Sequence, residues 1–289
     1  MSDTASPTIL VTGATGNVGR EVAQGLSELH IPYRAAVRSI AVNDRQPWQH
    51  QVVLDFLKPG TYDSALEGMK RIFLIRPPAL ADPEDFDRFL QAARRQGVEH
   101  VVFLSLLGAQ TLFFVPHRKI EKKIVKASVP YTFLRPSFFM QNMNTTHREE
   151  IRDEHHIYVP AGNGKTSFID VRDIAAVACR CLTEQGHENK SYDLTGAEAL
   201  TYEEVARQMS DSWHTTITYD NPSSKQFKAY WLNKGLPEDQ VKVMAGIYLT
   251  AKLGLAKKVT PELERLLGRP PITIRTYLED YRSDFGFPR

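Results

Sequence analysis

The chain has 289 residues, of which 36 are lysine or arginine and 34 are aspartate or glutamate, so its formal net charge is +2. Its 42% hydrophobic content and two cysteines exclude long disorder, a fibrous protein and a disulfide-built scaffold. The near-neutral charge argues against nucleic-acid binding, and no apolar run approaches the roughly 18 residues of a membrane span. Because Met1–Pro7 is too short and polar for a signal peptide, we expect a soluble, cytoplasmic protein.

A strand, a glycine-rich turn and a helix follow one another near the amino terminus. The aliphatic run Thr8–Thr12 predicts a buried strand, and Arg20–Leu29 has the spacing of an amphipathic helix. Glycines at 13, 16 and 19 lie between them, and glycine lets a backbone turn sharply and approach a pyrophosphate at a helix N-terminus. We therefore predict a dinucleotide-binding turn, with cofactor-binding roles for Thr12, Gly13, Thr15, Gly16, Asn17, Val18 and Gly19.

The second strand indicates which dinucleotide binds. Residues 32–37 read as a strand that ends at Arg38. An acidic residue at this point holds the 2′-hydroxyl of NAD, whereas an arginine suits a 2′-phosphate. Arg38, with Arg34 nearby and no acidic residue before Asp44, predicts NADP(H) in preference to NAD(H).

Strand-like and helical runs then alternate, which predicts an α/β fold with a doubly wound parallel sheet of the Rossmann type. The predicted strands are 52–54, 71–75, 100–104 and 131–135, and the predicted helices are 61–68, 83–96 and 116–128. After residue 137 helices predominate, at 170–182, 201–211, 223–233, 237–252 and 260–267, and a hairpin turn is expected at 162–166 between strands 157–159 and 167–169. We expect a dinucleotide-binding domain of residues 1–150 and a smaller, mostly helical substrate lobe of residues 151–289, with 166–195 returning to the sheet.

Further motifs occur in a fixed order along the chain. They are Thr12–Gly19, Asp55, Ser105–Ala109, His117–Glu121, Pro130–Pro136, Phe168–Ala175, Leu194–Gly196 and Leu200–Val205. This ordered set resembles the NmrA-like branch of the atypical short-chain dehydrogenases/reductases. The resemblance implies an NADP-binding protein of one of two kinds. One is a reductase of quinones or triphenylmethane dyes, and the other is a non-catalytic regulator that senses NADP(H) and binds a protein partner.

The sequence departs from short-chain dehydrogenases in general at one pair of positions. Those enzymes carry a Tyr-x-x-x-Lys pair shortly before a glutamate that corresponds to Glu121, and counting back places Phe113 and His117 at the two positions. Phenylalanine cannot protonate a carbonyl oxygen, so carbonyl reduction by the usual mechanism is not expected. Hydride transfer from NADPH to a quinone or a similar conjugated, electron-poor acceptor needs mainly that the acceptor stack over the nicotinamide.

The other candidate residues follow the ends of the predicted strands. To the cofactor we assign Asp55, Phe56, Arg76, Pro77, Ser105 and Pro136, and the catalytic candidates are His117 and Ser105. His117 could bond a ribose hydroxyl, donate a proton or be a buried structural histidine. Phe138, Phe139 and Met140 form either a wall for the acceptor or plain core. We expect a small-molecule acceptor, a monomer or homodimer, and no metal, nucleic acid or membrane partner.

Overall fold

The computed structural model describes residues 6–40, 50–77, 84–112 and 115–287, and the chain divides into two compact units. Unit 1 comprises residues 1–136 and 171–194, and unit 2 comprises residues 137–170 and 195–289. The units therefore divide at residue 136, whereas the sequence placed the boundary at 150. The extended chain runs through this point without a turn, so no local pattern marks the change.

Unit 1 is built on a parallel sheet of seven strands, which confirms the predicted Rossmann-type fold. From one edge to the other these are β10 (Lys190–Leu194), β6 (Tyr131–Pro136), β5 (His100–Leu104), β4 (Arg71–Ile75), β1 (Ile9–Val11), β2 (Tyr33–Val37) and β3 (Gln51–Val53). Strand β5 is buried at all five positions, as expected for a sheet covered on both faces. The order reverses between β1 and β4, and ligands of such sheets bind at the carboxyl ends of the strands beside this switch point.

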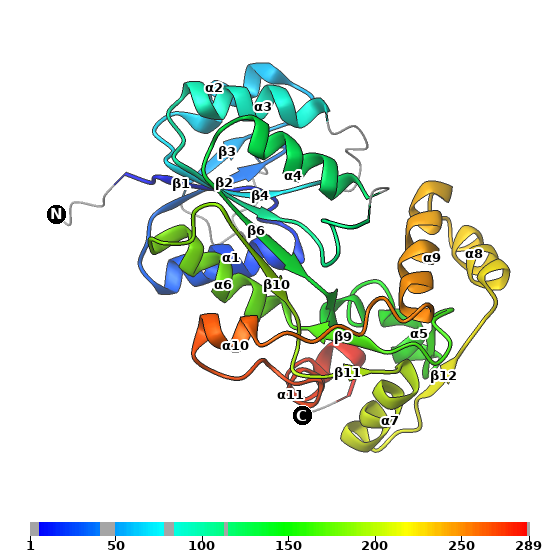
Figure 1. The fold of residues 1–289 in the computed structure, drawn as a ribbon. Helices are drawn as coiled ribbons and strands as arrows, with labels where there is room; N and C mark the ends of the chain where they lie inside the picture. The colour runs from blue at the N-terminus through cyan, green and yellow to red at the C-terminus, as the bar shows by residue number, and fades with distance from the viewer. Residues whose placement is uncertain (1–5, 41–49, 78–83, 113–114, 288–289) are drawn as a thin grey trace. The chain divides into compact units, whose positions relative to one another are not determined.

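Helices cover both faces of the sheet in unit 1 (Figure 1). On one face lie α2 (Tyr62–Leu66), preceded by the short η1 (Pro59–Thr61), α3 (Glu84–Arg95) and α4 (Pro116–Lys126), and on the other lie α1 (Asn17–Glu28) and α6 (Val171–Thr183). Helix α6 packs against α1 so closely that a methyl group at Gly25 would lie 2.9 Å from the Cys179 sulfur. This packing returns the chain to unit 1, where β10 pairs with β6.

Unit 2 combines many helices with short strands. Its elements are β7 (Phe138–Phe139), η2 (Met140–Asn142), α5 (Arg148–Asp153), β8 (His156–Tyr158), β9 (Thr166–Ile169), β11 (Ala199–Leu200), α7 (Tyr202–Trp213), β12 (Thr218–Asp220), α8 (Ser224–Asn233), α9 (Glu238–Lys252), α10 (Glu262–Leu267), α11 (Ile274–Asp280) and η3 (Arg282–Phe285). The predicted hairpin is wrong: β8 pairs with β12, and β9 pairs with β7 and β11. No helix in the described ranges is long and apolar enough to cross a membrane.

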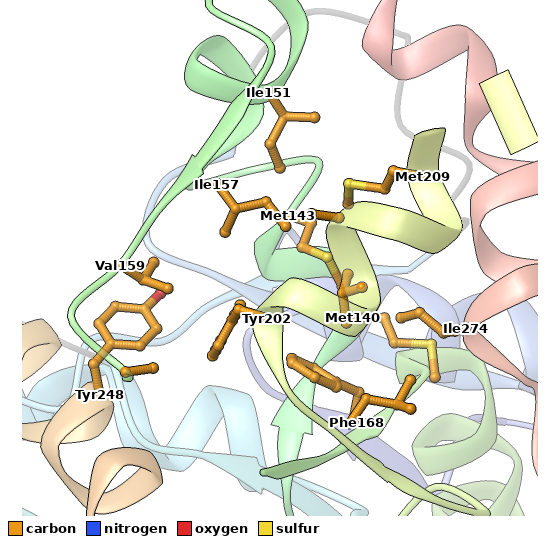
Figure 2. Close-up of a cluster of buried hydrophobic side chains, with 14 of the residues drawn as sticks. Met140, Met143, Ile151, Ile157, Val159, Phe168, Tyr202, Met209, Tyr248 and Ile274 are labelled. Carbon is orange, nitrogen blue, oxygen red and sulfur yellow. The ribbon is translucent and has the colours of Figure 1, made fainter. Parts of the chain in front are cut away.

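A hydrophobic core and two well-capped helices organise unit 2. Met140, Phe168 and Ile274 come together in this core (Figure 2), and Met140 is only 2% exposed. Helices α7 and α8 each begin with a capping box, in which a hydroxyl side chain and the residue three positions later bond each other's backbone N–H. The caps explain why both helices start within one residue of their predicted positions.

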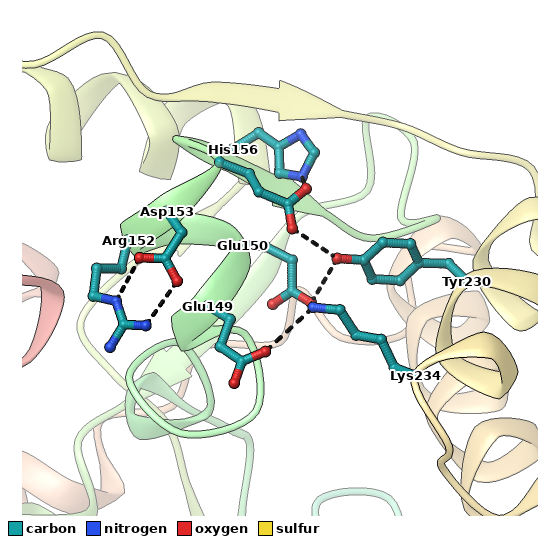
Figure 3. Close-up of polar contacts among 8 residues, drawn as sticks. Glu149, Glu150, Arg152, Asp153, His156, Tyr230 and Lys234 are labelled. Atoms are coloured by element: carbon teal, nitrogen blue, oxygen red, sulfur yellow. Dashed lines mark hydrogen bonds and ion pairs between the residues drawn. The ribbon is translucent and has the colours of Figure 1, made fainter.

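A polar cluster around the buried Glu150 joins α5 to the end of α8 (Figure 3). Lys234 Nζ lies 2.9 Å from Glu150 Oε1 and 3.4 Å from Glu149 Oε2. Glu150 is fully buried, and the Tyr230 hydroxyl lies 3.1 Å from the same carboxylate oxygen. Because a buried carboxylate without a partner is strongly destabilising, this ion pair makes α8 and α5 depend on each other.

Candidate cofactor-binding site

The glycine turn after β1 has a backbone shape that other residues would not allow. Gly13 has a φ of +63°, in the left-handed region, and its carbonyl accepts a hydrogen bond from the Gly16 N–H at 2.9 Å. A methyl group on Gly19 would overlap the Gly13 carbonyl, so the first turn of α1 lies directly against the loop. Glycine at 13 and 19 therefore lets α1 begin close to the end of β1.

The N-terminus of α1 remains open to a ligand. Gly16 is the N-cap residue, no described side chain caps the helix, and the first turn contains no acidic residue. Gly13, Thr15 and Gly16 are exposed, whereas the Val18 side chain is buried in the core, so only the backbone N–H of Val18 can reach a ligand. Free N–H groups at the positive end of a helix suit a pyrophosphate, so the turn fits a dinucleotide.

Thr12, directly after β1, holds the glycine turn in place. Its buried hydroxyl donates to the Phe73 carbonyl at 3.0 Å and accepts from the Ile75 N–H at 2.8 Å. These two bonds tie the carboxyl ends of β1 and β4 together at the switch point. The structure thus gives the Thr12 hydroxyl protein partners, and its contribution to a cofactor is indirect.

The structure separates the two arginines that the sequence placed together on β2. Arg38 follows the strand and is exposed, and within the described ranges its side chain forms no hydrogen bond or ion pair. The Arg34 guanidinium instead donates to the carbonyls of Ser64 at 3.0 Å and Glu67 at 3.1 Å, at the end of α2. Four residues of a strand span about 13 Å, so Arg34 lies toward the amino end of the sheet. Arg34 therefore holds the end of α2 against the sheet, and its assignment to the cofactor is wrong.

Asp55 and Phe56 follow β3 on the same side of the switch point as Arg38. The Asp55 carboxylate accepts the Leu57 N–H at 3.0 Å, which shapes the local turn. The Phe56 ring is buried, and its centroid lies 5.0 Å from that of Phe86. The other Asp55 oxygen, Oδ2, lies 3.6 Å from Lys58 Nζ, and the Phe56 side chain belongs to the core.

Ser105 and its partners form a buried network on the other side of the switch point. The Ser105 hydroxyl donates to Glu121 Oε1 at 2.6 Å. Arg135 grips the same carboxylate in bidentate fashion, with Nε at 2.9 Å from Oε1 and Nη2 at 2.8 Å from Oε2. The sequence contained a signal for this network: Arg135 is the one charged residue of strand β6, and a buried charge requires a partner.

His117 lies one helical turn before Glu121, on the first turn of α4. Its Nδ1 is buried, and no described residue bonds it. Burial, with a smaller contribution from the nearby Arg76, lowers the pKa of His117 to about 4. The imidazole is therefore neutral at pH 7 and offers a hydrogen-bonding nitrogen. It does not serve as a cationic acid.

Arg76 and Pro136 complete this side of the site. Ile75 and Leu104 are paired in register, so Arg76 and Ser105 each follow the end of a neighbouring strand. Burial lowers the pKa of Arg76 below its ordinary value. Pro77 follows Arg76 and is half-buried, and the Pro136 carbonyl accepts the Leu107 N–H at 2.9 Å. Phe113, the counterpart of the usual tyrosine, lies outside the described residues.

The three candidates for an acceptor wall all belong to unit 2, and they differ in burial. Met140 is part of the hydrophobic core, so its assignment as a substrate residue is not retained. Phe138 is partly buried against the same core. Phe139 is half-buried and remains a candidate.

A doubly wound parallel sheet with an open glycine turn at its switch point defines a dinucleotide-binding protein of the Rossmann class. The chain belongs to the NmrA-like family, whose model matches residues 5–264.

Relatives and solved structures resemble the chain over nearly its whole length. It is 31% identical to the NAD(P)H azoreductase of Xenophilus azovorans, over 96% of this chain and 99% of that protein. The NADPH-dependent quinone oxidoreductase of Escherichia coli, solved with NADPH, matches with a TM-score of 0.84 and 27% identity over 95% of this chain and 99% of that one. The triphenylmethane reductase of Citrobacter sp., solved with NADP(H), matches with a TM-score of 0.81 and 26% identity over 94% and 99%.

Proposed function

We propose that this protein is an NADPH-dependent oxidoreductase that transfers a hydride to a quinone or a similar conjugated, electron-poor acceptor. The names of its relatives support this class, because they include an azoreductase, a quinone oxidoreductase and a triphenylmethane reductase. For a quinone the overall reaction consumes NADPH and one proton and yields the hydroquinone and NADP⁺.

The observation that carries the proposal is that neither Ser105 nor His117, the two polar groups beside Arg76, is set up to donate a proton. The Ser105 proton is directed to Glu121, and the neutral His117 has a pKa lowered to about 4 by burial. An unactivated ketone requires an acid beside its oxygen as the hydride arrives. A quinone or a cationic dye is already electrophilic, and water can complete the protonation. Because the described groups beside Arg76 include no poised acid, the site favours such acceptors.

The residues of unit 1 then have binding and orienting roles. The open N-terminus of α1 would hold the pyrophosphate, and the Thr12 bonds keep that turn in place. The reduced nicotinamide, when bound, supplies the hydride. His117 Nδ1 would accept a hydrogen bond from a ribose hydroxyl, which would satisfy a buried nitrogen.

We assign the preference for NADP(H) to Arg38. Its side chain is exposed beside the end of β2, on the side of the switch point away from Ser105. A guanidinium there suits a 2′-phosphate, because it can bind two phosphate oxygens at once.

The test is a steady-state assay of NADPH oxidation by the purified protein. The panel holds a benzoquinone, a naphthoquinone, an azo dye and a triphenylmethane dye, with an aliphatic ketone as the control. We expect turnover with at least one conjugated acceptor and none with the ketone. If NADPH binds but no acceptor is turned over, the proposal is wrong and a non-catalytic, cofactor-sensing protein is favoured instead.

A further inference from the structure

The network of Ser105, Glu121 and Arg135 determines where the serine proton lies. A carboxylate held by a bidentate arginine is ionised and can only accept hydrogen bonds. Glu121 Oε1 is 2.6 Å from Ser105 Oγ, so the single hydroxyl proton of the serine is directed to the carboxylate. What Ser105 offers to a ligand is therefore its lone pairs, and it acts as a hydrogen-bond acceptor.

The same network holds the serine rigidly. Ser105 is 4% exposed and Glu121 is 6% exposed, and the Ser105 N–H donates to the Leu134 carbonyl at 2.8 Å. Three elements thus meet at the hydroxyl: the end of β5, helix α4 and strand β6. If the Ser105 hydroxyl turned away from Glu121, the buried carboxylate would lose one hydrogen bond. The orientation of the hydroxyl toward Glu121 is therefore strongly favoured.

The position of Ser105 in the sheet indicates which part of a dinucleotide it meets. The pyrophosphate site lies at β1, and the 2′-phosphate residue Arg38 lies on the β2 side. Ser105 follows the end of β5, which lies two strands from β1 on the side opposite to β2, about 10 Å away at ordinary strand spacing. That half of the dinucleotide carries the nicotinamide ring, and the N–H donor of this ring is its carboxamide group. The ribose hydroxyls lie nearer the pyrophosphate.

We propose that Glu121 and Arg135 are positioning residues that keep Ser105 as an acceptor for the carboxamide N–H of bound nicotinamide. The bond would fix the rotation of the ring and so the face from which hydride leaves. This inference rests on the proposed function, because it takes NADP(H) as the ligand. It adds that recognition of the carboxamide depends on a serine with a directed proton.

The test compares the binding of two nucleotides, so it does not depend on turnover. NADP⁺ is one, and the other is its 3-acetylpyridine analogue, in which a methyl group replaces the carboxamide NH₂. Loss of a hydrogen bond worth ~1 kcal/mol lowers affinity about fivefold. Ser105→Ala is therefore expected to weaken NADP⁺ about fivefold and to leave the analogue within about twofold of wild type.

Glu121→Gln tests the positioning role directly. A glutamine amide can donate a hydrogen bond to the Ser105 oxygen, so the hydroxyl hydrogen is no longer directed toward residue 121. We expect this change to reduce the preference for NADP⁺ over the analogue. Binding of 2′,5′-ADP, which lacks the nicotinamide half, controls for folding and should not change in either variant. Thr111→Val, at an exposed hydroxyl that donates to the Gly108 carbonyl, is the matched control for a lost hydroxyl.

The outcomes separate this inference from the proposed function. Equal losses for NADP⁺ and the analogue in Ser105→Ala would overturn the acceptor role, while turnover of a quinone by the wild-type protein would still stand. An unchanged preference in Glu121→Gln would overturn the positioning role. If the wild-type protein binds 2′,5′-ADP but shows no preference between the two dinucleotides, the carboxamide contact is absent and the inference is wrong.

Discussion

Arg34 and Arg38 carry the same charge on the same face of one strand, yet their surroundings differ completely. Arg34 donates to carbonyl groups at the end of α2, and Arg38 is exposed beyond the end of β2. The difference arises because the two residues lie about 13 Å apart along the strand direction. Arg34 is toward the amino ends of the strands and Arg38 is at their carboxyl ends. Only the residue at the carboxyl edge can meet a ligand bound at the switch point.

Arg38→Ala is expected to weaken NADPH binding about 10- to 100-fold and to leave NADH binding nearly unchanged. The reason is the loss of a charge-assisted contact worth ~1.5–3 kcal/mol that only a 2′-phosphate can make. Titration of both nucleotides into the variant gives the two affinities. Arg34→Ala is the matched control, which should lower the melting temperature and keep the NADPH-to-NADH ratio. A parallel loss for both nucleotides in Arg38→Ala would refute the assignment.

At the scale of elements, α1 and the glycine turn before it form one continuous structural unit. The helix begins at Asn17, three residues before the predicted start. Gly16 closes the turn by donating to the Gly13 carbonyl and is also the N-cap, so the helix starts directly after the turn. Periodicity and turn chemistry predicted β1 to β6, β8, β9, the longer helices and the glycine turn, and they missed β7, β10, β11 and β12. They also missed α5 and α11, which have six and seven residues. The pairing of β8 with β12 is also non-local and left no local signal.

Gly19→Ala is expected to destabilise unit 1 by about 1–3 kcal/mol, as overpacking of a tight site does. The new methyl group would overlap the Gly13 carbonyl and push α1 away from the turn, so NADPH and NADH should both bind more weakly. Chemical denaturation and nucleotide titration measure the two effects. Gly60→Ala is the control, because nothing lies within 4 Å of a methyl group there. Wild-type affinity in Gly19→Ala would show that the close packing does not support the site.

At the scale of the whole molecule, burial makes both units sensitive to acid. Desolvation lowers the pKa values of His100 and His117 in unit 1 and of His147 in unit 2 to about 4, from an ordinary value of 6.5. The folded state keeps each ring neutral, whereas the unfolded chain takes up a proton below pH 6.5. Stability is therefore fully present above that pH and falls as the pH drops toward 4.

Each such histidine should contribute a slope of at most about 1.4 kcal/mol per pH unit to the free energy of unfolding between pH 6 and 4.5. Trp213 and Trp231 lie in unit 2, and Trp48 lies in the sequence range of unit 1. Fluorescence during urea denaturation in a Trp48→Phe background therefore reports the unit that holds His147. His147→Gln should flatten the pH dependence of that transition, although it also lowers stability at pH 7 by removing the bond to Tyr248. Tyr248→Phe, which removes the same hydrogen bond and keeps the imidazole, is the control and should not flatten it. An unaltered slope in His147→Gln would contradict this account.

The sequence by itself determined the parallel α/β sheet and the dinucleotide turn, because strand and helix periods, glycine spacing and capping residues are local features. Its ordered motifs carried the resemblance to the NmrA-like family. Only the tertiary structure decided which arginine reaches the carboxyl edge, that Met140 packs in the core, that His117 is neutral and that the Ser105 proton points to Glu121. Each of these depends on burial and on partners distant in the chain. Protonation and proton direction are set by such surroundings, and no residue carries them in its own identity.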